Sequence, residues 1–270
     1  MTTTDLLPGG TIITPDTNVT DIGNTLAENN VLRSFNFDNG DGGLEHGVLN
    51  GGTIDFSQGF VRGTYPAGVD GNSVWTNIPL GEFNTREIFV EFKARFPTPV
   101  RHGLKFLKVF GKNNQPGGYA NTTFGLDYSV AGGSITAVSF GGGSVPENDT
   151  ANVIKLNGDN PDWIGRSYGG ALVNIPQYSN FTEWGTDWHR FRIHCKFNSG
   201  DSAENEVADG AYYLEIDGKV YVDAVGLFNR HWSNGDIGSV QIFGWSQTNV
   251  PNFTVDYDDL VVSRHGFVGR

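Results

Sequence analysis

The sequence predicts an all-β protein, built as a two-sheet antiparallel β-sandwich with an extended N-terminal arm. Residues 188–197 alternate without a fault between a largely cationic set and an apolar set, and side chains on a strand point to opposite faces in turn. The 270 residues include 38 Gly and 19 Phe, a composition typical of short strands and tight turns and not of long helices. Candidate strands follow one another from residue 32 onward with no linker between them.

Residues 1–31 are expected to form the extended arm. They are rich in Thr, Asn and Asp, contain Pro8 and Pro15, and follow neither the period of a strand nor that of a helix. A segment without a core of its own becomes ordered by docking, so we expect the arm to dock on its own domain or on a neighbouring subunit of a homo-oligomer. The first residues show neither a basic n-region nor an apolar h-region, so no secretory signal is expected.

Residues 32–270 are expected to form one β-sandwich domain. Short candidate strands at 34–38, 53–56 and 60–65 are bounded by glycine-rich turns. Longer candidates follow at 87–96, 104–110, 124–130, 134–140, 188–197, 212–216, 219–223, 240–245 and 253–263.

Turn signals and two helical prospects complete the prediction. Asp217–Gly218 lies between two candidate strands and is a strong signal for a two-residue hairpin. The helical prospects are single turns near 177–184 and 224–229.

Charge is unevenly distributed along the chain. The formal net charge is −12, from 30 acidic against 18 basic side chains, which argues against nucleic-acid binding because that requires phosphate neutralisation by basic groups. Nothing approaches the roughly 18 consecutive apolar residues of a membrane span, so no membrane partner is expected. Yet one face of the 188–197 strand carries Arg190, Arg192, His194 and Lys196. This cationic ladder is either neutralised by acidic neighbours or faces an anionic ligand. The single cysteine, Cys195, falls on the opposite, apolar face and is predicted to be a core thiol.

Five segments carry a resemblance to a known family. Their order and spacing resemble the polysaccharide-lyase-like jelly rolls of the concanavalin A-like lectin/glucanase superfamily, over roughly residues 32–265. The segments are T-R-E-I-F-V-E-F-K-A-R-F (85–96), H-G-L-K-F-L-K-V-F-G (102–111), D-W-H-R-F-R-I-H-C-K-F-N (187–198), Y-Y-L-E-I-D-G-K-V-Y-V-D (212–223) and F-T-V-D-Y-D-D-L-V-V-S (253–263). These motifs are structural and occur in modules that cut sugars, in modules that only bind them and in virion proteins, so the fold alone does not settle the function.

The resemblance implies two stacked sheets, one of them curved into a glycan-binding groove. If the ladder lines that groove, alternate Arg side chains would grip successive acidic sugars through bidentate contacts with carboxylates. The residues then expected to bind an acidic glycan are Lys93, Arg95, Arg190, Arg192 and His194. The alternative is a solvated face on which these cations pair with Glu91, Glu215 and Asp217.

A lyase of this family would need more than binding. It must neutralise a uronate carboxylate, remove the adjacent proton and protonate the leaving oxygen. The candidates are His194 or His102 as the base, Arg190 or Arg192 as the neutraliser, and Tyr213 or Tyr128 as the acid. The sequence has neither the Q-I-H strand nor the Y-F-K-A-G-type strand of the alginate lyases in the wider group, and this departure counts against catalysis.

Aromatic residues in loops give a second indication of glycan binding. Exposed aromatic faces are good platforms for the apolar faces of sugars. Trp232 and Trp245 are the candidates that we include among the ligand-binding residues, the alternative being that each fills the edge of the core.

A structural calcium ion is a further expectation. Asp38, Asp256 and Asp258 offer the oxygen ligands that calcium takes, near the first and last strands, although aspartates at strand ends more often cap turns. No cofactor is required by any of the functions considered.

The function expected first is a structural or adhesion protein of a virion, such as a bacteriophage decoration, fibre or tail component. It would sit on the virion surface, bind a glycan and contact other virion subunits through the arm. This expectation depends on the arm and on the missing export signal. The alternatives are an extracellular polysaccharide lyase that cleaves uronate-containing glycans by β-elimination, and a carbohydrate-binding module.

Overall fold

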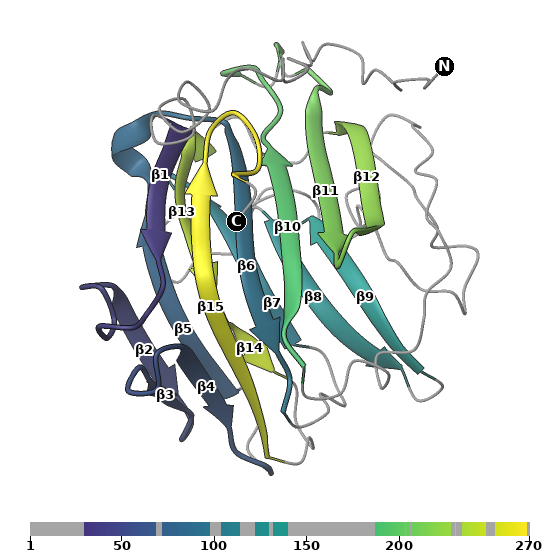
Figure 1. Ribbon diagram of the computed structural model, residues 1–270. Helices are drawn as coiled ribbons and strands as arrows, with labels where there is room; N and C mark the ends of the chain where they lie inside the picture. Colours follow the sequence, from purple (N-terminus) through teal and green to yellow (C-terminus); the bar gives the residue numbers. More distant parts are fainter. Residues whose placement is uncertain are drawn as a thin grey trace, which may run out of the picture.

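Two antiparallel β-sheets stack face to face in the computed structural model (Figure 1), which confirms the predicted β-sandwich. The structure describes residues 30–68, 72–97, 104–113, 122–129, 132–139, 187–202, 204–205, 207–227, 230, 234–246 and 252–268. Within them the elements are strands and one short 3₁₀ turn, η1 (Gly81–Phe83), and none is a helix long and apolar enough to cross a lipid bilayer. All but the last two residues of the predicted arm lie outside this part of the chain.

The eight-stranded sheet, here called sheet A, has the order β12-β11-β10-β6-β15-β4-β3, with β1 also paired to β15. Its strands are β1 (Val31–Phe35), β3 (Thr53–Asp55), β4 (Val61–Tyr65), β6 (Glu87–Arg95), β10 (His189–Lys196), β11 (Gly210–Ile216), β12 (Lys219–Leu227) and β15 (Phe253–Ser263). The last strand therefore lies inside the sheet, with β6 on one side and β4 and β1 on the other (Figure 1).

The seven-stranded sheet, sheet B, stacks behind sheet A in the view of Figure 1. Its strands are β2 (Glu45–Leu49), β5 (Asn72–Pro79), β7 (Leu104–Gly111), β8 (Thr122–Ser129), β9 (Gly132–Ser139), β13 (Ile237–Ile242) and β14 (Trp245–Ser246). β13 and β14 share the position between β5 and β7. They are separated by Phe243, whose φ of 62° is left-handed, and by Gly244.

The core lies between the sheets and is built from the apolar half of each alternating strand. Phe191, Ile193 and Cys195 of β10 are fully buried, so the predicted core thiol is confirmed. Phe92 of β6 stacks on Phe191, with ring centroids 5.0 Å apart. Burial of these side chains fixes the register of the sheet, because a slip by one residue would turn every apolar side chain toward solvent.

The hairpin prediction is confirmed, one of the two helical predictions is wrong, and two strands were missed. Asp217 and Gly218 both have positive φ, 52° and 80°, as a type I′ hairpin requires. The helical turn predicted near 224–229 is wrong for residues 224–227, which continue strand β12. The other helical prospect, near 177–184, lies outside the described residues. Strands β2 and β5 were not predicted.

Candidate functional site

The cationic ladder lies on the outer face of sheet A, and its arginines meet acidic side chains of the neighbouring strands. The carboxylate of Glu91, on β6, is nearly buried and lies 2.5 Å from the guanidinium of Arg190 and 3.4 Å from that of Arg192. Arg192 also lies 3.4 Å from Glu215 of β11. Of the two alternatives for the ladder, this geometry matches the one in which its arginines pair with Glu91 and Glu215.

The remaining basic side chains of this face also have acidic partners. His194 Nε2 lies 2.8 Å from Glu87 Oε1, and the hydrogen bond from His194 lowers the pKa of Glu87 below its ordinary value. Lys93 Nζ lies 2.6 Å from Asp259, and Lys196 Nζ lies 3.5 Å from Asp209. Binding of an acidic glycan by the ladder stays a prediction, and it would have to compete with these ion pairs.

Asp259 reaches Lys93 because of a β-bulge. Strict alternation along β15 places Asp259 on the face of the core residues Phe253 and Val255. The register of β15 against β6 shifts between Asp258 and Val261, and Asp259 takes a left-handed φ of 49°. A bulge of this kind re-aims a side chain, and here it turns the carboxylate to the outer face.

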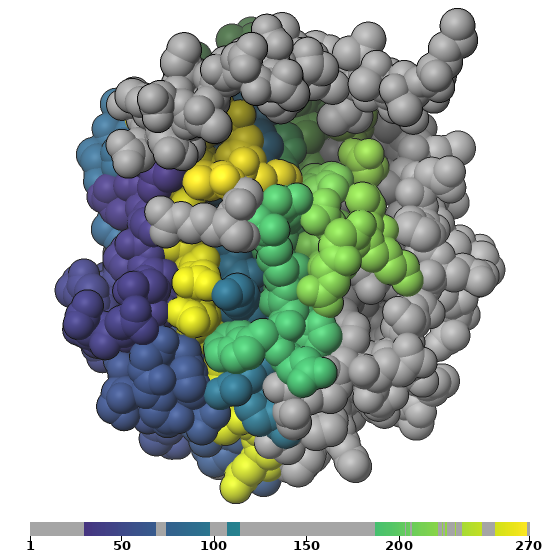
Figure 2. Space-filling view, viewed as in Figure 1, coloured from purple at the N-terminus to yellow at the C-terminus, as the bar shows by residue number. Residues whose placement is uncertain are grey.

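The C-terminal segment folds back over the ladder. The ring of Phe267 packs edge-on against Phe89, with centroids 5.2 Å apart, and lies 5.9 Å from the ring of Tyr213. The guanidinium of Arg192 lies 5.3 Å from the centre of the same ring. Val268 lines a small hollow beside Arg190, and in Figure 2 the yellow C-terminal segment lies against green β10.

Of the six catalytic candidates, His194, Arg192 and Tyr213 are brought together, but each is held by a carboxylate, as Arg190 is by Glu91. His194 lies directly opposite Tyr213 on adjacent strands, and Arg192 lies opposite Glu215. The hydroxyl of Tyr213 donates to Glu215 Oε2 at 2.7 Å, and burial, together with this carboxylate, raises the pKa of Tyr213 well above its usual range. His102 lies outside the described residues, and of Tyr128 only the backbone is described.

The predicted calcium ligand Asp256 serves another role. Its side chain is fully buried and bridges two arginines: Oδ1 accepts from Arg62 Nε at 2.7 Å, and Oδ2 accepts from Arg62 at 2.8 Å and from Arg95 Nε at 2.7 Å. Both oxygens are thus occupied, so this carboxylate does not fit a calcium ion. The described residues contain no group of three or more His, Cys, Asp or Glu side chains arranged to hold a metal. Calcium binding through Asp38 and Asp258 stays a prediction.

A second candidate site appears on the outer face of sheet B. Gln241 of β13 lies directly opposite Asn77 of β5 on one side and opposite Lys108 of β7 on the other. Each of the three is half-buried and lies between two buried residues of its own strand, so all three side chains leave the sheet on the same face. The side chains of Asn77 and Gln241 make no hydrogen bond within the described part of the chain. We call these three residues the polar row.

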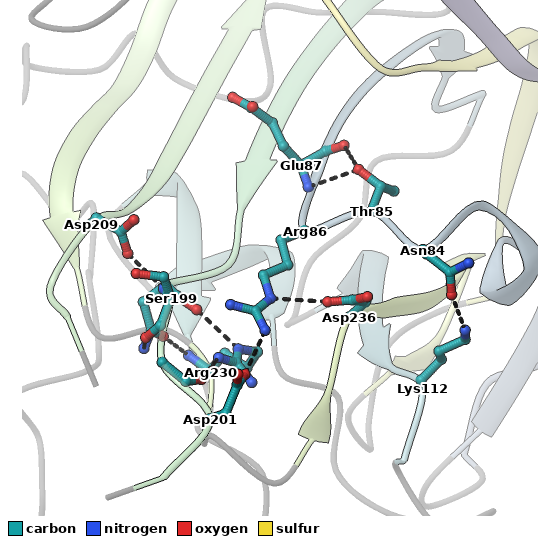
Figure 3. Close-up of polar contacts among 12 residues, drawn as sticks. Asn84, Thr85, Arg86, Glu87, Lys112, Ser199, Asp201, Asp209, Arg230 and Asp236 are labelled. Carbon is teal, nitrogen blue, oxygen red and sulfur yellow. Dashed lines mark hydrogen bonds and ion pairs between the residues drawn. The ribbon is translucent and has the colours of Figure 1, made fainter. Parts of the chain in front are cut away.

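Contacts at the end of the sandwich fix the register of the polar row. The amide of Ile237, where β13 begins, donates to the carbonyl of Thr85 at 2.8 Å. Arg86, which directly precedes β6, contacts Asp236 at 2.9 Å and Asp201 at 2.7 Å (Figure 3). Because Asp236 directly precedes β13, this arginine ties the strand that carries Gln241 to sheet A.

Comparisons with known proteins identify the fold. No family model and no curated protein matches the sequence, but solved structures do. An alginate lyase from Chlorella virus matches with a TM-score of 0.55 and 15% identity, over 87% of this chain and 100% of that one. A mutant of the alginate lyase Aly36B in complex with alginate trisaccharide matches with a TM-score of 0.54 and 16% identity, over 86% and 97% of the two chains. An endo-β-1,4-glucuronan lyase from the fungus Trichoderma reesei matches with a TM-score of 0.54 and 12% identity, over 87% and 95%.

The fold is the polysaccharide-lyase-like jelly roll. At these identities the likeness establishes the fold and assigns no residue a role. It confirms the architecture that the five sequence segments indicated. The likeness covers 95% or more of each of the three lyase chains, so the match extends over nearly the whole length of each lyase.

The side chains of the two tryptophans predicted to bind glycan lie outside the described part of the structure. Trp232 lies outside the described residues. Only the backbone of Trp245 is described, and it pairs with Ser73 of β5.

Sequence reasoning missed the residues of the polar row and Trp75, which lies on β5 two positions before Asn77. The available signal was the alternation of Val74, Thr76 and Ile78, all buried, with Trp75 and Asn77. Since the side chains of the first group point into the core, the second group had to point outward.

Proposed function

We propose that this jelly roll is a polysaccharide lyase that cleaves a uronate-containing glycan on the outer face of sheet B. The observation that carries the proposal is the polar row, in which two amides and one ammonium group stand side by side on adjacent strands. Two donors and a cation in line are suited to a sugar carboxylate and its neighbouring hydroxyl groups.

The row extends along the sheet in both directions by backbone register. Glu45 of β2 pairs with Asn77, and Thr123 of β8 pairs with Lys108. Five adjacent strands therefore contribute one position each. At about 4.8 Å between strands, the line is about 19 Å long, which is enough for several sugar units laid across the strands.

The reaction requires charge neutralisation at the uronate. A base removes the proton from the carbon next to the carboxylate carbon, the glycosidic carbon–oxygen bond breaks toward the leaving oxygen, and that oxygen takes up a proton, leaving a carbon–carbon double bond in the sugar. Negative charge grows on the carboxylate group as the proton departs. The ammonium group of Lys108 and the amide N–H groups of Asn77 and Gln241 would stabilise that charge.

On the ladder of sheet A, Glu91, Glu215 and Glu87 contact Arg190, Arg192 and His194, so a glycan carboxylate bound there would compete with those carboxylates. The comparisons also favour a lyase over the virion role expected first, because the matched structures are enzymes that act on uronate polymers. A lyase would meet such a polymer outside the cell. Assembly with virion subunits stays a prediction.

The test is turnover of defined polymers by the full chain. Alginate, glucuronan and a neutral polymer are each incubated with the protein, and the ultraviolet absorbance of the unsaturated product is followed. We expect product from at least one polyuronate and none from the neutral polymer. Absence of product from every polyuronate would contradict the proposal.

Substitutions locate the reaction on one sheet. Lys108→Met removes the ammonium group at nearly constant volume and should lower kcat/KM by about 100-fold, in the range of other losses of a group that stabilises transition-state charge. Lys108→Arg should retain part of the activity, and Lys219→Met, on the hairpin of sheet A, serves as the control for loss of one charge. If Lys93→Met lowers activity and Lys108→Met does not, the site lies on the ladder.

A further inference from the structure

Trp75 and Gly47 make an unusually close contact at the edge of sheet B. They lie directly opposite each other on β5 and β2. A Cβ atom built on Gly47 would lie 2.4 Å from Cζ2 of the indole and 2.6 Å from Cε2, distances that packed carbon atoms do not reach. Only glycine at position 47 therefore lets the indole lie across the backbone of β2.

The indole is placed next to the polar row. Trp75 and Asn77 are two residues apart on β5, so they share the outer face and are about 7 Å apart along the strand. On β2, Leu49 is also on this face, since it pairs with Ser73, and it is 55% exposed. The ring of Trp75 is half-buried. An aromatic ring and an exposed leucine thus form an apolar patch beside the amide and ammonium groups.

We propose that Trp75, supported by Gly47, is a stacking platform for a pyranose ring of the glycan, about 7 Å along β5 from the uronate held by the polar row. The apolar C–H face of a pyranose packs on an indole through dispersion and the negative face of the ring. The proposed lyase function identifies the glycan to which that ring belongs. Stacking requires no charge on the sugar, so this position accepts a neutral sugar as readily as a uronate.

The protein would thus recognise its substrate through two features of the sugar chain. The polar row selects a carboxylate, and the platform selects a ring with an unobstructed apolar face. Loss of the platform weakens binding of the ground state and of the transition state equally, so KM rises while kcat stays the same.

The experiment combines binding and kinetics on the full chain. Oligosaccharides of alginate, of glucuronan and of neutral β-1,4-glucan are titrated against the wild type and the variants, with tryptophan fluorescence and calorimetry as readouts. Trp75→Ala should weaken binding about three- to tenfold, the range of aromatic contacts, and raise KM by the same factor at unchanged kcat. Trp75→Phe should restore most of the loss.

Gly47→Ala tests the support of the ring. The added methyl group must push the indole away, so we expect a shift in tryptophan emission and a rise in KM similar to that of Trp75→Ala. Val225→Ala, an exposed position on β12 of sheet A, is the matched control and should change neither quantity. Unfolding in urea confirms that each variant is folded under the assay conditions.

The outcomes separate this inference from the proposed function. If polyuronates are cleaved and Trp75→Ala leaves KM and affinity unchanged, the platform is overturned and the lyase stands. If no polymer is cleaved but oligosaccharides bind and Trp75→Ala weakens that binding, the platform is supported on a protein that only binds glycans. A wild type that binds none of the oligosaccharides overturns the platform as well.

Discussion

The phenolic hydroxyl of Tyr65, on β4, both donates to the carbonyl of Gly244 at 3.0 Å and accepts from its amide at 3.3 Å. The pair joins sheet A to the break between β13 and β14 in sheet B. Both groups are buried, and burial raises the pKa of Tyr65 well above its usual range. One side chain thus satisfies both backbone groups of Gly244 where the regular ladder is interrupted.

Tyr65→Phe should lower the free energy of unfolding by about 1 to 3 kcal/mol, because it leaves the amide and carbonyl of Gly244 buried without a partner. Urea unfolding followed by circular dichroism measures the change. Tyr213→Phe is the matched control, since its hydroxyl bonds to the half-buried Glu215. An equal loss in the two variants would contradict the special role of Tyr65.

Asp256→Asn should be more costly than the loss of a surface ion pair. The carboxylate is fully buried while Arg62 and Arg95 remain 28% and 25% exposed, so we expect a loss of about 2 to 3 kcal/mol, below that of a wholly buried pair. Thermal and urea unfolding measure it. Asp201→Asn, at a carboxylate that is 80% exposed, should change stability by less than about 0.5 kcal/mol. Similar losses at both positions would show that burial of Asp256 is unimportant.

Glu87→Gln should change the dependence of stability on pH. The hydrogen bond from His194 lowers the pKa of Glu87 from its ordinary value of 4.5. A lowered folded-state pKa stabilises the fold above the unfolded value, and this contribution disappears as the pH falls through the folded value. The wild type should therefore exceed the variant in unfolding free energy at about pH 6, and the gap should narrow as the pH falls below the ordinary value of 4.5. If the difference in unfolding free energy instead grew as the pH falls, the lowered pKa of Glu87 would be contradicted.

Phe267→Ala should loosen the C-terminal segment without affecting turnover. The ring contacts Phe89, Tyr213 and the guanidinium of Arg192, so its removal should lower the unfolding free energy by about 1 kcal/mol. Hydrogen exchange should quicken in residues 264–268. Activity on a polyuronate should be unchanged, because the proposed site lies on the other sheet. A change in KM would indicate that the ladder takes part in binding.

The strand at 188–197 was predictable because its pattern is local. Period-2 alternation requires only neighbouring residues, and the buried half, Phe191, Ile193 and Cys195, follows directly from it. Strand β5 was less visible because Asn72, Thr76 and Asn77 interrupt the apolar pattern, although Thr76 is fully buried. The outward orientation of the Asp259 side chain depends on a bulge in the pairing of β15 with β6. The sequence pattern of β15 does not predict this bulge.

The candidate site was harder to predict than the fold. The polar row combines β5, β7 and β13, which are distant in sequence, and a shift of one residue in either pairing would separate Asn77 or Lys108 from Gln241. The ladder, in contrast, was visible as a pattern on one strand. The alternation alone does not decide whether the ladder binds a glycan or pairs with Glu91 and Glu215. That depends on the register of β10 against β6 and β11, which brings these carboxylates next to the arginines.

The central place of β15 has a consequence for biosynthesis. This strand pairs with β6, β4 and β1, and the ribosome makes it after all of them. Without residues 253–263, sheet A is divided into three unconnected parts, β12-β11-β10-β6, β4-β3 and the single strand β1. Unpaired strand edges are prone to aggregation, so the edges of β6, β4 and β1 that β15 covers are aggregation-prone in a chain that has not yet reached this strand.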